Sequence, residues 1–315
     1  MTANGRPQAP LMTNTQADRV KEVARLAGRP SRSRRREFLA EGPQAAREAV
    51  RLHLGRVDAG ADGVVVDVFA TGEALARHDD LAALLASPDA PRLRRVTPEV
   101  LAAMSSTVTP QGFIAVCRFV DTSLDEVLAS GPQLIAVLVG VRDPGNAGTI
   151  IRAADAAGAH AVILTGSSVD PYNPKTVRST VGSLFHLPLV NGAQLEGLTD
   201  RLRGAGLTIL AADGYGTTDL DELQDASASR RIGVTPEGIA LRLDSQPAPP
   251  RGDTVRLEDP AAWLFGNEAQ GLDDTVTEEA DARVAVPIYG SAESLNVGTA
   301  ATVCLYASAR AQRES

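Results

Sequence analysis

A chain of 315 residues is long for a single hydrophobic core, so its length predicts two domains. With 43% hydrophobic residues the composition is that of a globular protein, and a net charge of −8 argues against a protein that coats nucleic acid by charge alone. Positive charge is nevertheless concentrated near the N-terminus, where eight lysines and arginines stand against two acidic residues between Asp18 and Arg36.

Several classes of protein are disfavoured by single residue types. Cys117 and Cys304 lie far apart in apolar runs, which indicates core residues and no disulfide framework or redox pair. The histidines lack the spacing of metal ligands, so no metal site is expected. No apolar stretch is long enough for a membrane span, and the N-terminus lacks a signal-peptide core. The sequence therefore favours a cytoplasmic protein without a membrane partner.

The first residues are expected to form a tail and then a basic segment. Residues 1–16 are rich in Thr, Asn, Gln and Pro, which predicts disorder. A helical pattern begins at Ala17 and ends before Pro30. The basic run that follows contains Arg32, Arg34, Arg35 and Arg36. This run is either a solvated loop or a surface that contacts phosphates.

Short strands and helices then alternate, which predicts a small α/β domain over 17–120. The expected strands are 37–40, 63–69, 93–96 and 112–120, and the expected helices are 43–54, 73–77, 81–86 and 98–104. The polar segment 121–132 contains Gly131-Pro132 and is expected to be a linker.

A second α/β domain is predicted over 133–315. The apolar run 134–141 is typical of a buried parallel strand, and with a turn at 143–146, a helix at 148–157 and a strand at 160–165 it predicts a βαβ unit. Further expected elements are helices at 175–183 and 195–203, a short strand that begins at Leu189, and strands at 207–212, 263–265 and 284–287. The charged, proline-rich stretch 219–260 is expected to be a loosely structured surface insertion, or else a second basic contact surface.

Polar residues follow three of these strands and suggest a ligand site at the carboxyl edge of the sheet. The residues of interest are Asn146, Gly148, Arg152, Gly266, Glu268, Ser294 and Asn296. Four of them have a structural alternative: Asn146 and Ser294 suit helix N-caps, Arg152 suits an ion pair with Asp155, and Glu268 suits a cap before 273. Each motif alone is weak, but their common position strengthens the prediction of a site.

A dinucleotide-binding alternative is disfavoured. Gly214 and Gly216 follow a strand, but the third glycine is replaced by Asp219 and no helix is expected to open there.

At these residues the chain resembles the SpoU (TrmH-like) family of RNA ribose methyltransferases, within the SPOUT class. The resemblance rests on three motifs in order: Asn146-x-Gly148-x-x-x-Arg152, the run Leu264–Leu272, and Pro287-x-x-Gly290 followed by Ser294-Leu295-Asn296-Val297. Two features depart from the family pattern. Gly298 stands where a serine is usual, which is expected to loosen the first helical turn, and the 219–260 insertion is longer than typical.

The resemblance implies a parallel sheet with a deep trefoil knot in the second domain, and a homodimer. Residues 36–120 resemble, more loosely, the substrate-binding domain found before it in many members, with a fold like that of some ribosomal proteins. Phe38–Gly42 and Gln111–Phe113 carry this second likeness.

The resemblance also implies the ligand and the roles of the site residues. S-adenosylmethionine would be bound by Leu264, Gly266, Val286, Ile288 and Leu295. Arg152 would be central to catalysis, with Asn146, Glu268, Ser294 and Asn296 around it. A guanidinium normally stays protonated, so gripping the phosphate beside the target ribose suits Arg152 better than acting as a base. Arg32, Arg34, Arg35 and Arg36 would contact structured RNA through phosphates.

The resulting expectation is an S-adenosylmethionine-dependent RNA 2′-O-methyltransferase acting on ribosomal RNA, most simply 23S. A transfer RNA enzyme, a methylase that confers antibiotic resistance and a non-catalytic RNA-binding protein remain as alternatives.

Overall fold

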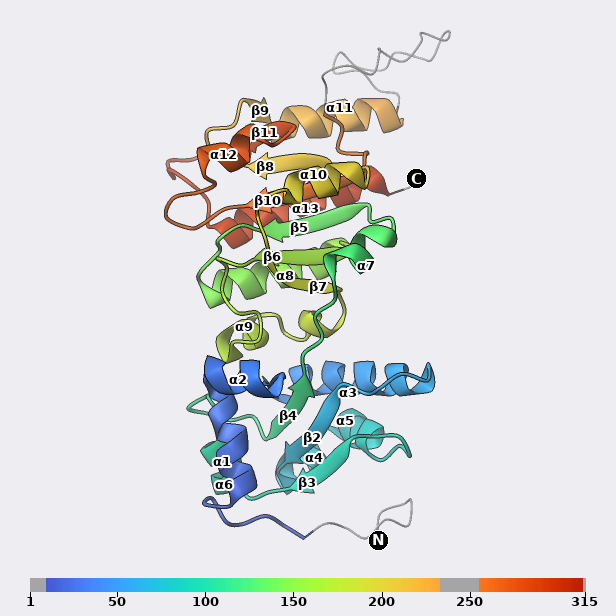
Figure 1. Cartoon of the computed structure of the whole chain (residues 1–315), viewed down its shortest axis with the longest axis vertical. Helices are drawn as coiled ribbons and strands as arrows, with labels where there is room; N and C mark the ends of the chain where they lie inside the picture. The colour runs from blue at the N-terminus through green and yellow to red at the C-terminus, as the bar shows by residue number, and fades with distance from the viewer. Residues whose placement is uncertain (1–9, 233–254, 314–315) are drawn as a thin grey trace. The chain divides into compact units, whose positions relative to one another are not determined.

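The computed structural model describes residues 10–232 and 255–313. The chain forms two compact units, whose elements are labelled in Figure 1. Unit 1 is the chain up to Asp121 together with Asp170–Leu187, and unit 2 is Thr122–Val169 with the chain from Pro188 onward. Residues 1–9 of the predicted tail and residues 233–254 of the predicted insertion lie outside the described residues.

Unit 1 is built on a four-stranded mixed sheet in the order β1-β4-β2-β3. Its strands are β1 (Glu37–Glu41), β2 (Val65–Ala70), β3 (Arg92–Arg95) and β4 (Phe113–Arg118). The central strand β4 is antiparallel to both β1 and β2, whereas β2 and β3 are parallel. All four strands expected in this region are present. Strands β2 and β4 are short runs rich in β-branched and aromatic residues, whereas β3 is Arg92-Leu93-Arg94-Arg95 at the edge of the sheet.

Helices cover this sheet. They are α1 (Asp18–Ala24), η1 (Arg25–Ala27), α2 (Arg29–Arg35), α3 (Pro43–Asp58), α4 (Gly72–Arg77), α5 (Asp79–Leu85) and α6 (Pro98–Met104), with α9 (Pro174–Ser179) and η2 (Ser183–Phe185) from the later segment. One apolar cluster joins α1 and α6 to the sheet through Val20, Val100, Leu39, Phe69 and Ile114.

The basic run differs from its expected loop conformation, since residues 29–35 form the helix α2. Pro30 stands in the first turn, where its missing N–H costs nothing. The helical pattern that begins at Ala17 does end before Pro30, at Gly28, and α2 is a separate helix that the sequence did not predict.

The segment Asp170–Leu187 is attached to unit 1 by a cluster of aromatic rings. Tyr172 is fully buried, and its ring centroid lies 3.9 Å from that of Phe119 and 4.7 Å from that of Phe38. The Tyr172 hydroxyl donates to Asp121 Oδ1 and accepts from the backbone N–H of Val120, both at 2.9 Å. Burial, with the nearby Asp121 charge, raises the pKa of Tyr172, so the hydroxyl keeps the proton that it donates.

Unit 2 contains a seven-stranded sheet in the order β7-β6-β5-β10-β8-β11-β9. The strands are β5 (Leu134–Leu138), β6 (Ala161–Thr165), β7 (Leu189–Ala193), β8 (Thr208–Ala212), β9 (Thr218–Asp219), β10 (Ala261–Phe265) and β11 (Ala282–Ala285). Every neighbouring pair is parallel, as predicted, so the carboxyl ends of all the strands lie along one edge.

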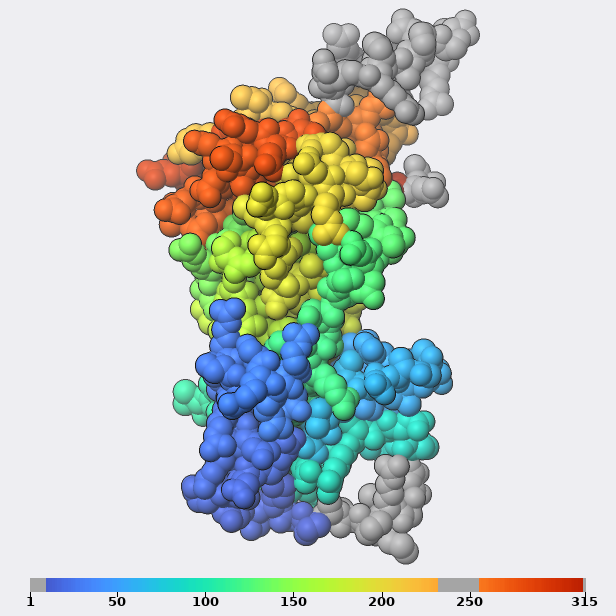
Figure 2. All heavy atoms as spheres, viewed as in Figure 1, coloured from blue at the N-terminus to red at the C-terminus, as the bar shows by residue number. Residues whose placement is uncertain are grey.

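Both faces of this sheet are buried, which explains the continuous apolar runs of β5, β6 and β10. The helices are α7 (Leu124–Ala129), α8 (Pro144–Ala157), α10 (Leu198–Gly204), α11 (Leu220–Ile232), α12 (Asp274–Glu278) and α13 (Val297–Gln312). Side chains of α7, α10 and α12 share one core cluster with β5 and β10. In Figure 2 the yellow side chains of α10 cover the strands beneath them. On the other face, Trp263 Nε1 of β10 donates to Ser308 Oγ of α13 at 2.9 Å.

In unit 2, two helices occur where the sequence predicted none. The predicted linker contains α7, whose start is a capping box: Ser123 Oγ accepts from the N–H of Glu126, and the Glu126 carboxylate accepts from the N–H of Ser123. The predicted loose insertion begins with the 13-residue helix α11.

Of the two glycines before α11, Gly216 has a packing role. A Cβ on Gly216 would lie 2.5 Å from the carbonyl oxygen of Arg283 beside it, so this glycine allows two backbones to approach.

In the described part of the chain no helix is long and apolar enough to cross a membrane.

Candidate active site at the carboxyl edge of the parallel sheet

Helix α8 starts directly after β5, and its cap is Asp143. Asp143 Oδ1 accepts from the backbone N–H of Asn146 at 2.9 Å, and Pro144 occupies the first helical position. The alternative in which Asn146 caps the helix was therefore wrong. Asn146 lies within the first turn instead, which leaves its amide free to make other bonds.

The Asn146 side chain links two other loops of the sheet edge. Its Nδ2 donates to Glu268 Oε1 at 3.1 Å, in the loop after β10. Its Oδ1 accepts from Asn296 Nδ2 at 2.9 Å, at the start of α13. Three of the predicted site residues, from three separate motifs, thus form one hydrogen-bonded network.

Glu268 anchors this network through its carboxylate. The oxygens also accept from the backbone N–H of Asp143 at 3.1 Å and from that of Arg142 at 3.4 Å. Partial burial raises the pKa of Glu268, but these donors and Asn146 favour the charged form more strongly, so the net pKa is lowered. Glu268 is ionised at neutral pH and acts as an acceptor only. It does not cap the helix near 273, because α12 has Asp273 at its N-cap position.

Asn296 is the cap of α13. Its Oδ1 accepts from the backbone N–H groups of Gly298 at 2.9 Å and Thr299 at 3.4 Å. The prediction of Ser294 as the cap was wrong by two residues. Both the oxygen and the nitrogen of the Asn296 amide are thus engaged. Ser294 is exposed, and its hydroxyl has no hydrogen-bond partner in the described residues.

Arg152 stands on α8 with its side chain exposed. Within the described residues it takes part in no hydrogen bond or ion pair, so the predicted alternative of a pair with Asp155 does not occur. A long, charged side chain without a protein partner is available to an anionic ligand.

Four of the five predicted cofactor residues occupy the two loops after β10 and β11, and the fifth, Leu264, lies within β10. Gly266 is buried, and a Cβ on it would lie 2.3 Å from the backbone carbon of Gly271, so only glycine fits this turn. Two backbone hydrogen bonds between Asn267 and Gly271, at 2.8 and 2.9 Å, close the turn. The Leu264 side chain is 1% exposed and belongs to the core.

The loop 286–295 has a different character. In the part of the chain that the structure describes, none of its residues donates or accepts a backbone–backbone hydrogen bond. Val286 is half-buried, while Ile288 and Leu295 are each 37% exposed. Free backbone polar groups thus lie next to accessible apolar side chains.

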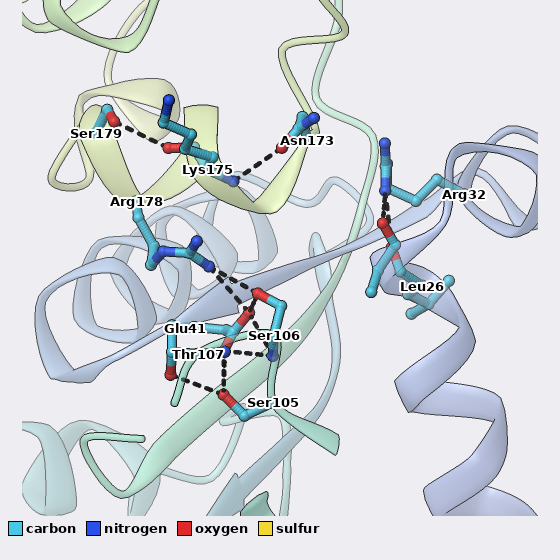
Figure 3. A network of polar contacts seen from close by, with 11 residues as sticks. Leu26, Arg32, Glu41, Ser105, Ser106, Thr107, Asn173, Lys175, Arg178 and Ser179 are labelled. Carbon is cyan, nitrogen blue, oxygen red and sulfur yellow. Dashed lines mark hydrogen bonds and ion pairs between the residues drawn. The ribbon is translucent and has the colours of Figure 1, made fainter. Parts of the chain in front are cut away.

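The four predicted RNA-binding arginines have different environments. Arg32 is 2% exposed, and its guanidinium donates to Asp170 Oδ2 and to the carbonyl oxygens of Leu26 and Ala27. Figure 3 shows the bond to Leu26. A side chain buried and saturated in this way holds Asp170–Leu187 to unit 1 and is not accessible to a phosphate. The positive charge at position 32 is therefore explained by these contacts within unit 1, without any contact to RNA.

The other three arginines remain on the surface. Arg35 donates a hydrogen bond to the Glu37 carboxylate, and Arg36 donates one to that of Asp121. The Cζ atom of Arg36 lies 4.6 Å from the centroid of the Phe119 ring. Arg34 is exposed and makes no bond to the described residues. Of the predicted contacts, Arg34 is the most available.

Two residues of the site were not singled out from the sequence. Asp143 caps α8, and the Asp-Pro order that signals a helix start was available. Asn267 Nδ2 donates to the carbonyl oxygen of Gly140 at 3.0 Å and ties the loop after β10 to the one after β5. No sequence spacing indicates this bond.

Gly298 allows α13 to approach α8 closely, so its effect is opposite to the expected loosening. A Cβ on Gly298 would lie 2.9 Å from Cγ2 and 3.1 Å from Cβ of Thr149. The first turn of α13 is also fixed by the Asn296 cap.

We expect Gly298→Ala to lower the free energy of unfolding by about 1–3 kcal/mol, because the new methyl group overpacks against Thr149. Thr149→Ser removes Cγ2 but keeps the hydroxyl that donates to the Gly145 carbonyl. The double variant should therefore recover most of the loss in urea unfolding curves. Additive losses in the double variant would show that the two residues do not clash.

Comparisons with known proteins agree with this geometry. The model of the SpoU rRNA Methylase family matches residues 133–306, and that of the MRM3-like substrate binding domain matches residues 17–115. The chain is 31% identical over 291 residues to the 23S rRNA (guanosine(2553)-2′-O)-methyltransferase RlmP of Bacillus subtilis, covering 91% of this chain and 94% of that protein. It is 31% identical over 206 residues to the 23S rRNA (uridine(2479)-2′-O)-methyltransferase of Streptomyces viridochromogenes, covering 64% and 61%.

Solved structures give the same result. An AdoMet-bound rRNA methyltransferase from Sinorhizobium meliloti superposes with a TM-score of 0.71 at 26% identity, over 96% of this chain and 97% of that one. The α/β fold with a parallel sheet therefore matches that of SPOUT methyltransferases. With both a family model and a full-length relative in agreement, this chain belongs to the SpoU rRNA methylase family.

Proposed function

We propose that this protein transfers a methyl group from S-adenosylmethionine to a ribose 2′-hydroxyl of 23S ribosomal RNA. The observation that carries the proposal is the Asn146–Glu268–Asn296 network, which joins the three family motifs at one sheet edge. The names of the relatives support ribosomal over transfer RNA. They include both guanosine and uridine as targets, so they do not select the base.

The two loops after β10 and β11 suit S-adenosylmethionine. Exposed Ile288 and Leu295 provide apolar surface for an adenine ring, and the unpaired backbone groups of 286–295 provide donors and acceptors for its edge and for the ribose. Gly266 lets the neighbouring turn stay narrow. The buried Leu264 side chain would support the pocket from beneath. When bound, the cofactor supplies an electrophilic methyl group.

Arg152 and Ser294 are the groups left to act on the RNA. The Arg152 guanidinium would grip the phosphate next to the target ribose and hold the 2′-hydroxyl in line for transfer. The Ser294 hydroxyl would form a hydrogen bond with the ribose. Asn146, Glu268 and Asn296 are bonded to one another and to backbone groups, so they would position the loops that carry the reacting groups.

Two larger features of the family are also part of the proposal. A trefoil knot in unit 2 is supported by the strand order, because β10 is inserted between β5 and β8, which precede it in the chain. A crystal structure would contradict the knot if its backbone trace could be straightened by its two ends without a knot remaining. Unit 1 would bind RNA, in line with its match to a substrate-binding domain, and its fold would resemble that of some ribosomal proteins.

A methylation map tests the function and the role of Arg152 together. We expect one ribose of 23S rRNA to be methylated in cells with the protein and unmethylated in cells without it. Arg152→Ala should reduce the methylation rate about a hundredfold, because the nucleophile loses its positioning. Arg201→Ala is the matched control, since it changes an exposed arginine on α10, a helix that carries none of the site residues. Identical maps with and without the protein would refute the function.

A homodimer through α13 is supported by its exposed apolar side chains. Val303 is 38% and Tyr306 47% exposed, and both lie on one face of the helix. Val303→Glu should shift the protein toward monomers in sedimentation, because a twofold interface would bury the charge twice. Tyr215→Glu, at an exposed aromatic residue outside α13, should not. A monomeric and fully active wild-type protein would contradict the dimer.

Surface arginines of α2 would contact RNA phosphates. Arg34→Ala should reduce the slope of log affinity against log salt by about 1, because one phosphate contact is lost. Arg77→Ala removes an exposed arginine that is paired with Glu73 and should leave the slope unchanged. Filter binding of a 23S rRNA transcript over a range of salt concentrations measures both. Equal slopes for Arg34→Ala and wild type would exclude Arg34 from the contact surface.

A further inference from the structure

Unit 1 contains a hollow of about 310 Å³ that the proposed mechanism does not use. It lies where the end of β1, the start of α3, the loop after α6 and the segment after α9 meet. Its lining includes Gly42, Ala45, Thr109, Gln111, Arg178 and Val181. All of them belong to unit 1.

One wall of the hollow is fixed by the carboxylate of Glu41, whose side chain is 5% exposed. Ser105 and Ser106 donate to it through their hydroxyls, and Ser106 also through its backbone N–H at 3.2 Å. Arg178 donates from Nη1 to Ser106 Oγ at 2.7 Å and lies 3.5 Å from Glu41 Oε1. Figure 3 shows this arrangement, in which the side chain of Arg178 points from α9 toward the end of β1. The negative charge is thereby neutralised within the wall.

Other polar groups of the hollow have no partner among the described residues. They are the backbone N–H groups of Gln44 and Ala45 in the uncapped first turn of α3, the Thr109 hydroxyl and the Gln111 amide. Gln111 lies directly over the backbone of Gly42, where a Cβ would come within 2.9 Å of Gln111 Oε1. Ala45, Pro110 and Phe113 supply apolar surface between these groups.

The rim is conformationally strained at Val181. Its φ is +53°, in the left-handed region that a β-branched residue rarely adopts, and it is 41% exposed. Gly182 follows with φ +99°, and a Cβ there would meet Glu48 Cγ at 2.7 Å, which fixes the turn. Strain of this kind persists where the surrounding structure holds it, and it is concentrated at binding sites.

A ligand for this hollow should be flat, uncharged and rich in both donors and acceptors. Of the residues lining the hollow, all of which the structure describes, Arg178 is the one cation, and it is already engaged by Glu41 and Ser106. A phosphate is therefore poorly matched. A nucleobase fits, because it presents both kinds of group on its edge and an apolar face. Sequence-specific RNA recognition commonly takes unpaired bases into such pockets.

We propose that this hollow binds one unpaired nucleobase of the RNA, away from the methylated ribose, and so contributes to the choice of target. The inference rests on the proposed function only in taking RNA as the ligand.

The test uses the full chain and an unmethylated 23S rRNA transcript. Irradiation at short wavelength should crosslink a nucleotide to the peptide that contains Gln111 and Phe113. Thr109→Trp fills the hollow from an exposed position and should abolish this crosslink and weaken binding roughly tenfold or more. Gln111→Ala removes one amide and should weaken binding about fivefold. The smaller change keeps the test valid if the tryptophan variant does not fold.

Val108→Trp is the matched control. It places the same ring on the adjacent residue, which is fully exposed and does not line the hollow. Wild-type binding and crosslinking by Thr109→Trp and Gln111→Ala would overturn the proposal, as would equal losses for Val108→Trp and Thr109→Trp. S-adenosylmethionine binding, measured by calorimetry, should be the same in all variants. A chain that crosslinks at the hollow but binds no S-adenosylmethionine would refute the proposed function and leave the nucleobase site intact.

Discussion

The candidate site depends on one hydrogen-bonded chain of side chains, from Glu268 through Asn146 to Asn296. Parallel strands bring their carboxyl ends to one edge, but loops after separate strands have no reason to keep a fixed distance. Glu268 supplies that constraint, because its ionised carboxylate collects an amide and two backbone N–H groups. Removing any one donor would leave a partly buried charge less satisfied, which couples the three loops energetically.

This network decides which predicted residues are free to contact a substrate. Asn146 has both ends of its amide occupied, and Asn296 uses its amide to cap α13 and to bond Asn146. Arg152 and Ser294 lack partners in the described residues. The family motifs therefore contain residues that are held in the network and residues that are free to contact a ligand, a division that spacing in the sequence does not reveal.

The sequence predicted the parallel sheet and most elements correctly, because buried parallel strands are continuous apolar runs and the helices between them begin with Pro, Ser, Thr or Asp. It placed two caps wrongly. Asn146 and Ser294 are both good capping residues, and local propensity cannot show that Asp143 and Asn296 occupy those positions while Asn146 bonds 122 residues away.

Long-range pairing also explains what the sequence could not show in unit 1. Arg32 stands in a run of arginines that is typical of a phosphate-binding surface, yet its partner is Asp170, 138 residues later. Tyr172 lies in the same segment and completes the aromatic cluster on β1. The sequence around Arg32 and around Tyr172 does not indicate their distant partners. The assignment of Asp170–Leu187 to unit 1 therefore required the structure.

The groups free at the catalytic edge recognise features that every nucleotide shares. A guanidinium on a phosphate and a hydroxyl on a ribose do not distinguish one base from another. A methyltransferase that modifies one ribose among thousands must therefore take its specificity from contacts elsewhere. The hollow of unit 1 has the chemistry that the catalytic edge lacks: unpaired donors and acceptors beside apolar surface, with its charge already neutralised. The arginine surface contacts only phosphates, so it would be insufficient by itself to choose the target. Binding of the RNA backbone and recognition of a base would therefore be carried out by separate surfaces.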